Sequence, residues 1–291
     1  MNRLIAYITI GAATLPCMAQ QNDIEDDIKA LSETTAPNEW TPKDTFVYLA
    51  PQLNILLKKD HPSIVDTTNY YGDLFIYEGI STITDWHNKQ QIVLNFSSDN
   101  ANYRFHTNRS LASFNDSTYN PLIPGLYPLS ELRKAQILLT DRYFFIKTDQ
   151  YKPLTQPTET RKFIEVKIDS LSLDSIDSPV RIYFSDKKNQ QFTICTRLSN
   201  SLQPSQKHNF EEMFATTDPR EQYKDITDKR WNQIQAGEID VDMTQQEVLL
   251  SIGKPTRRDR QPTYSGMRET WEYQNGTLIT FQDSRVTQYR K

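Results

Sequence analysis

The chain has 291 residues, a formal net charge of -4 and a mean hydropathy of -0.67, with 15 Tyr and 13 Phe. Nucleic-acid binding would require a clustered excess of Lys and Arg, which this sequence lacks, so no nucleic-acid partner is expected. The length predicts two or three domains, and polarity combined with many aromatic residues favours small β-rich domains with aromatic cores.

The first 19 residues have the pattern of a signal peptide. Arg3 supplies the positive charge, residues 4–15 form a short apolar run, and 17–19 (Cys-Met-Ala) resemble a small-x-small cleavage site. We therefore expect a periplasmic or outer-membrane-associated protein, with no transmembrane span once the signal is removed. A lipid anchor on Cys17 is the alternative, and Pro16 argues against it because a lipobox requires Gly or Ala at that position.

A polar leader and a β-rich module follow the signal peptide. Residues 20–43 contain an acidic stretch at 23–32 that predicts a short helix, and the prolines at 37 and 42 are typical of a tether. Residues 44–110 form the first β module. Its strands are predicted at 45–50, 74–84, 91–96 and 102–107, with an interruption at Gly79 that indicates a bulge.

The same pattern returns after a predicted linker at 111–140. Strands at 142–148, 162–171, 180–185 and 191–197 define a second β module at 141–198, and Phe184 corresponds to Phe96 at an offset of about 90 residues. We interpret the two modules as an internal duplication. A strand set this short most simply closes into a small barrel or sandwich of the SH3-like kind, which is a fold-level analogy. A second linker is predicted at 199–224.

The final domain, 225–291, has the clearest local signals. Thr244 and Glu247 have the spacing of a capping box for a helix at 245–252 that ends at Gly253, and Thr227 is a candidate N-cap for a preceding helix. Three strands are predicted at 267–273, 277–282 and 285–289. Asn275-Gly276 predicts a type I′ turn, which needs positive φ at both residues, and 283–284 (Asp-Ser) predict a weaker turn.

This domain resembles the SmpA/OmlA (BamE-like) domain of bacterial envelope proteins. The family has a Gly-Met-Thr-x-x-(Glu/Gln)-Val motif, a Gly-x-Pro helix end and a Trp-x-Tyr strand. The matching residues here are Met243, Thr244, Glu247, Val248, Gly253, Pro255, Trp271 and Tyr273. Asp242 and the Asp283-Ser284 turn depart from the pattern. The resemblance covers about the last quarter of the chain. It implies two helices against a three-stranded meander and a non-catalytic, protein-binding role.

No pattern typical of a catalytic, metal or cofactor site is found in the sequence. The histidines, His61, His87, His106 and His208, lack metal-ligand spacing, and eight glycines make no phosphate loop. Cys195 is the only cysteine after signal cleavage, and we expect a buried structural thiol. A Cys195 nucleophile paired with His106 is the enzyme alternative. The sequence therefore predicts no enzyme activity and no cofactor.

The sequence as a whole predicts an α+β, predominantly β protein: two SH3-like modules followed by a BamE-like domain. We expect a non-catalytic binding or scaffold protein of the cell envelope. Its candidate contact is an exposed loop at 256–266, where Arg257, Arg258, Arg260 and Tyr264 are residue types enriched at interface hot spots. The alternative is an ordinary polar hairpin lead-in.

Two further expectations concern this function. Arg-to-Glu changes in the loop are expected to remove a partner while leaving thermal stability unchanged. The alternative function is binding of peptidoglycan or another glycan, for which Tyr103, Tyr183 and Trp86 would supply stacking faces.

Overall fold

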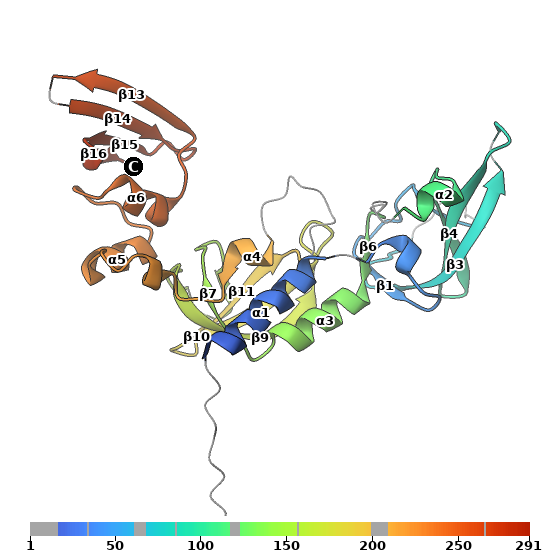
Figure 1. Ribbon diagram of the computed structural model, residues 1–291. Coiled ribbons are helices and arrows are strands. Elements are labelled where there is room, and N and C mark those ends of the chain that lie inside the picture. Colours follow the sequence, from blue (N-terminus) through green and yellow to red (C-terminus); the bar gives the residue numbers. More distant parts are fainter. Residues whose placement is uncertain are drawn as a thin grey trace, which may run out of the picture.

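The computed structural model describes residues 17–33, 35–60, 68–84, 86–116, 123–155, 157–198, 209–264 and 266–291 (Figure 1). The predicted signal peptide up to residue 16, His61, His208 and most of the predicted second linker lie outside the described residues. The described chain is mostly β, with two six-stranded sheets and one four-stranded sheet joined by short helices. This agrees with the predicted predominantly β class.

The first module is one antiparallel sheet in the order β2-β5-β4-β3-β1-β6. Its elements are β1 (Thr45–Tyr48), β2 (Leu57–Lys59), β3 (Leu74–Thr84), β4 (Gln90–Ser98), β5 (Ala101–His106), α2 (Leu111–Phe114) and β6 (Leu126–Pro128). The short 3-10 helix η1 (Pro37–Glu39) precedes them. The strand alternation places aromatic rings in the core, where Phe46 and Phe96 make an edge contact with centroids 5.7 Å apart.

The second module repeats this arrangement in the order β8-β11-β10-β9-β7-β12. Its elements are β7 (Tyr143–Ile146), β8 (Lys152–Pro153), β9 (Ile164–Leu173), β10 (Val180–Asp186), β11 (Gln191–Thr196), α4 (Phe210–Met213) and β12 (Phe214–Ala215). Each strand has a counterpart at the same place in the first sheet. The predicted pair Phe96 and Phe184 are both buried, on equivalent strands β4 and β10. The shared topology agrees with the predicted repeat, while a common origin stays a prediction.

The predicted linkers are wrong where the structure describes them. The segment 111–140 contains α2, β6 and the helix α3 (Leu129–Leu139), and β6 pairs with β1. The segment 199–224 contributes α4 and β12, and β12 pairs with β7. These closing strands have only two or three residues, too few to show an alternation in the sequence.

The predicted tether is also corrected, because its helix packs on the second module. The helix α1 (Cys17–Ser32) lies beside α3 (Figure 1), and Ile28 and Leu31 are buried in the core of module 2. Arg142 Nη1 donates to Asp27 at 3.0 Å. The predicted helix at 23–32 is therefore present, but it is docked rather than part of a free leader. Val47, Leu49 and Tyr127 of module 1 belong to the same core, so the two modules pack together.

The C-terminal unit is two helices and an antiparallel four-stranded meander. The short 3-10 helix η2 (Pro219–Gln222) leads into α5 (Asp228–Gln235) and α6 (Gln245–Ile252). The sheet consists of β13 (Arg257–Thr263), β14 (Gly266–Glu272), β15 (Leu278–Gln282) and β16 (Arg285–Arg290). Three strands were predicted and four are present, because the predicted loop at 256–266 is largely the edge strand β13. The core of the unit contains Trp271, Phe281 and Val248.

The turns of this sheet differ in type from the prediction. At the Asn275-Gly276 hairpin only Gly276 has positive φ, +85°, so the predicted type I′ turn is wrong although the hairpin is present. At the predicted weaker turn, Asp283 and Ser284 both have positive φ, +49° and +67°, as a type I′ turn requires. Asp tolerates this backbone region better than most residues.

The capping box of α6 is confirmed, and its removal is our first prediction. The Glu247 amide donates to Thr244 Oγ1 at 3.2 Å, and Glu247 Oε2 accepts from the Thr244 amide at 2.6 Å. We expect Thr244→Ala to lower the free energy of unfolding by about 1 kcal/mol, because the Glu247 amide loses its acceptor Oγ1. Urea unfolding compares it with Gln246→Ala, an exposed change on the same helix. Equal losses in both variants would contradict the capping role.

Candidate functional site

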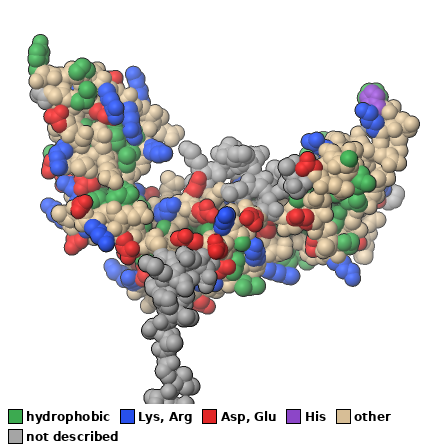
Figure 2. Space-filling view, viewed as in Figure 1, with side chains coloured by type: hydrophobic (Ala, Val, Ile, Leu, Met, Phe, Trp, Pro, Cys, Tyr) green, Lys and Arg blue, Asp and Glu red, His purple; other side chains and the backbone are tan. Residues whose placement is uncertain are grey.

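The predicted partner-binding residues lie on and just after the edge strand β13. Arg257, Arg258 and Arg260 are on the strand, and Tyr264 follows it in the turn, where its side chain is fully exposed. The strand pairs with β14 on one side, and among the described residues no strand pairs with its other side. Figure 2 shows Lys and Arg side chains gathered over the C-terminal unit. The predicted loop is therefore an exposed sheet edge.

Two of the three arginines are engaged on the helix-facing side of the sheet. Arg260 Nε donates to Glu269 at 2.8 Å, and the Arg258 guanidinium lies 4.4 Å from the ring centroid of Trp271. Arg257 lies opposite Glu272 in the strand register, one residue from Arg258 and three from Arg260, so alternation places it on the other face of the sheet. Arg257 and Tyr264 are thus the exposed members of the predicted set that make neither of these two contacts.

Glu269 explains why Arg260 is needed inside the unit. The carboxylate is only 4% exposed, and it accepts hydrogen bonds from Trp271 Nε1 at 2.6 Å, Arg260 Nε at 2.8 Å and Gln245 Nε2 at 2.9 Å. Burial alone would raise the pKa of Glu269, but these three hydrogen bonds outweigh it and lower the pKa. For Arg260 we therefore expect Arg-to-Glu to lower stability, in contrast to the expectation from the sequence, since a glutamate there would face a buried carboxylate.

Cys195 and His106 lie in different sheets. Cys195 is on β11 of module 2 beside Asp174 and Arg181, whereas His106 ends β5 of module 1. Burial, and then a hydrogen bond with Asp174, raise the pKa of the Cys195 thiol, which favours the unreactive protonated form. The geometry therefore gives no support to a Cys–His pair. Among the described residues, no group of three or more His, Cys, Asp or Glu could hold a metal ion.

The predicted glycan-stacking residues do not form one surface. Tyr103 is 3% exposed inside the core of module 1, so its ring cannot stack on a sugar. Tyr183 is half-buried on β10 of module 2, and Trp86 is exposed in the turn between β3 and β4. The stacking interpretation is wrong for Tyr103 and leaves the other two on separate modules.

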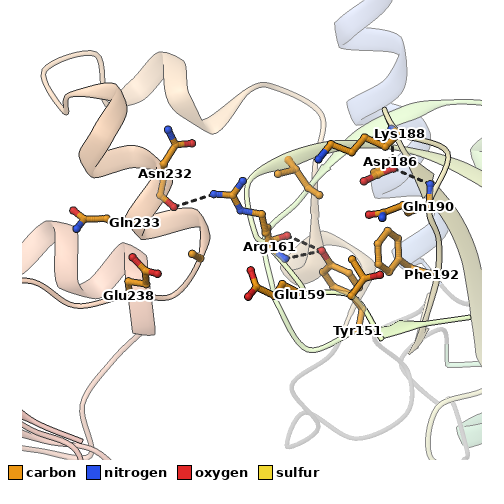
Figure 3. A pocket seen from close by; sticks show the side chains of 13 residues that line it. Tyr151, Glu159, Arg161, Asp186, Lys188, Gln190, Phe192, Asn232, Gln233 and Glu238 are labelled. Atoms are coloured by element: carbon orange, nitrogen blue, oxygen red, sulfur yellow. Dashed lines mark hydrogen bonds between the residues drawn. The ribbon is translucent and has the colours of Figure 1, made fainter. Parts of the chain in front are cut away.

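A cavity of about 500 Å³, which the sequence analysis missed, lies between module 2 and α5 (Figure 3). Arg161 reaches across it and donates to the Asn232 carbonyl at 3.2 Å. Tyr151 is fixed on the other side, because its hydroxyl donates to the Arg161 carbonyl and accepts from the Arg161 amide, both at 2.8 Å. Tyr151 and Phe192 are buried, so the cavity has a polar lining without an exposed aromatic face. No spacing pattern in the sequence signals these residues.

No family model, curated protein or solved structure matches this chain. None of the described helices has the length and apolar character needed to cross a membrane. The likeness to the SmpA/OmlA domain therefore stays a prediction made from the motif residues.

Proposed function

We propose that this chain is a non-catalytic scaffold protein of the bacterial cell envelope that binds another envelope protein through its C-terminal unit. In this proposal two SH3-like modules precede a BamE-like unit. The signal-peptide pattern at 1–19 is the support for export of the chain across the inner membrane. The observation that carries the binding role is the open, arginine-rich edge of β13.

The strand orders support the module assignments. In module 1, β1, β3, β4 and β5 are successive neighbours, and β6 returns to the free side of β1 after the short helix α2. We assign the SH3-like class to this order by analogy, because a set of strands this short most simply closes into a small barrel. The C-terminal unit has two helices followed by a meander, as the SmpA/OmlA resemblance implies, with β13 as an additional strand.

The edge of β13 suits an added strand from a partner. An extended segment can continue a sheet by pairing its backbone with an open edge. Pro262 lacks an amide hydrogen and limits the usable edge to 257–261. Arg257 and Arg258 in this stretch favour a partner segment with acidic side chains, whereas Arg260 is already paired with Glu269. The same arginines disfavour a second copy of the strand, because arginines would face arginines. Charged residues and proline also protect edges from aggregation, so binding needs a direct test.

The test changes only the residues that the unit itself does not use. We expect the double variant Arg257→Ser, Tyr264→Ser to lose a crosslinked partner in intact cell envelopes, because it removes a charge and an exposed ring at the edge without placing a carboxylate opposite Glu272. Arg290→Ser, an exposed change at the opposite edge, is the matched control and should retain the partner. Thermal unfolding should be unchanged in both. Retention of every crosslinked protein by the double variant would rule out this edge as the contact.

A further inference from the structure

One turn occupies the same place in both β modules. In module 1 the Gly72 amide donates to the carbonyl of Tyr48, the last residue of β1, at 2.8 Å. In module 2 the Phe163 amide donates to the carbonyl of Ile146, the last residue of β7, at 2.5 Å. Both residues have positive φ, +90° at Gly72 and +56° at Phe163. Because β1 and β7 are equivalent strands, Gly72 corresponds to Phe163 and Tyr71 to Lys162.

The residue before each of these positions bonds to the next unit along the chain. The Tyr71 hydroxyl donates to the carbonyl of Asp174 in module 2 at 2.7 Å. Lys162 Nζ donates to the carbonyl of Ser251 on α6 of the C-terminal unit. A side-chain donor at the same repeat position therefore reaches a backbone carbonyl of the following unit in both cases.

In module 2 the turn satisfies the carboxyl ends of both helices of the C-terminal unit. The Lys162 amide donates to the carbonyl of Gln235, the last residue of α5, at 3.0 Å, and Arg161 Nη2 donates to Asn232 of the same helix. Ser251 lies in the last turn of α6. The final carbonyls of a helix have no partner inside it, and positive charge is favourable there. The turn therefore supplies donors to the carbonyls of Gln235 and Ser251, whereas the Asn232 carbonyl, which Arg161 also contacts, already accepts from the Ala236 amide at 3.1 Å.

The side chain of Phe163 makes the apolar part of the same contact. Its ring stacks on Trp231 of α5, with centroids 5.5 Å apart and an interplanar angle of 28°. The Gln235 amide side chain donates to the Phe163 carbonyl at 3.0 Å. Apolar and polar contacts thus converge on three consecutive residues.

Two features of this turn are unfavourable for module 2 alone. An aromatic residue at positive φ is strained, and module 1 has glycine at the equivalent position. Lys162 is 7% exposed, and its burial lowers its pKa, although Asp149 at 3.7 Å acts in the opposite direction. Module 1 folds in the same topology without either feature. In module 2 both features accompany a contact with the C-terminal unit: Phe163 stacks on Trp231, and Lys162 bonds to Ser251.

We infer that the turn 161–163 is the docking element that holds the C-terminal unit in a fixed orientation on module 2. The equivalent turn of module 1 contacts the next unit in the same way, through Tyr71 and module 2. The edge of β13 is then presented at a fixed place relative to the two β modules. This inference does not depend on the proposed partner, and it holds or fails whether or not β13 binds one.

The experiment measures distances between spin labels on cysteines introduced at Ser170 of β9 and Gln288 of β16, both exposed, with Cys17 and Cys195 replaced by Ser. Double electron–electron resonance on the full chain should give one narrow distance distribution. We expect Phe163→Gly and Lys162→Met to broaden it, because each removes a contact to the helices. Phe163→Gly keeps a backbone that glycine adopts freely, so module 2 should remain folded in that variant.

The matched control is Lys167→Met, which removes a half-buried lysine paired with Asp141 on the same module, outside the turn 161–163. It should leave the distribution narrow. A broad distribution in the parent chain, or an unchanged narrow one in Phe163→Gly with circular dichroism as in the parent, would overturn the inference. Absence of a partner at β13, with a narrow distribution in the parent chain and a broadened one in Phe163→Gly, would instead count against the proposed function alone.

Discussion

Replacing Trp271 with Ala is expected to lower the free energy of unfolding of the C-terminal unit by about 3–5 kcal/mol, the range for removing a large buried aromatic side chain. Trp271 is fully buried, and its ring centroid lies 4.5 Å from that of Phe281. Its Nε1 donates to Glu269, and Arg258 covers its other side. A unit of this size has a total stability of about 5–10 kcal/mol, so the change is a large fraction of it.

Trp86→Ala is the control for this prediction, because Trp86 is 88% exposed on the β3–β4 hairpin. We expect a change within about 0.5 kcal/mol, as for most exposed substitutions. Hydrogen exchange of the full chain separates the units, and only Trp271→Ala should increase exchange in β14 and β15. A similar loss in both variants, or protection retained in Trp271→Ala, would contradict the central position of this ring.

Glu269→Gln is expected to destabilise the C-terminal unit by about 2–3 kcal/mol, since hydrogen bonds to a charged group are stronger than neutral ones. Three donors converge on this buried carboxylate from α6, β13 and β14. Glutamine would retain one acceptor oxygen but would direct its own amide hydrogens at the remaining donors. Glu272→Gln on the exposed face of the same strand is the control and should have little effect.

The pH dependence follows from the lowered pKa of Glu269. A carboxyl group whose pKa is lower when folded contributes stability that is fully present above its unfolded value, near 4.5, and is lost as pH falls through the folded value. Urea unfolding from neutral to acidic pH should therefore show a loss of stability below about pH 4.5 that is smaller in Glu269→Gln. Parallel pH profiles for the two proteins would show that Glu269 is not stabilised as an anion.

The candidate binding surface was only partly predictable. Arg257, Arg258, Arg260 and Tyr264 are exposed as expected, but they lie on a strand and not in a loop. The stretch 257–263 contains no apolar alternation, because its backbone pairs with β14 while all but its last side chain remain exposed. The roles of Arg258 and Arg260 inside the unit depend on Trp271 and Glu269, which follow in the next strand. Only the pairing register of β13 with β14 shows that Arg258 and Arg260 lie on one face of the sheet and Arg257 on the other.

Short-range chemistry is the part that could be read directly from the residues. The cap of α6, the helix α5 after Thr227 and the alternating strands of both modules are where the spacing predicts them, because caps and pleats involve residues a few positions apart. Contacts between distant segments could not be read in this way. The packing of α1 on module 2, the closing strands β6 and β12, and the turn at Phe163 each depend on a surface supplied by residues far away in the chain. A strained or polar segment becomes stable there because another element covers it, and no local pattern records which element that is.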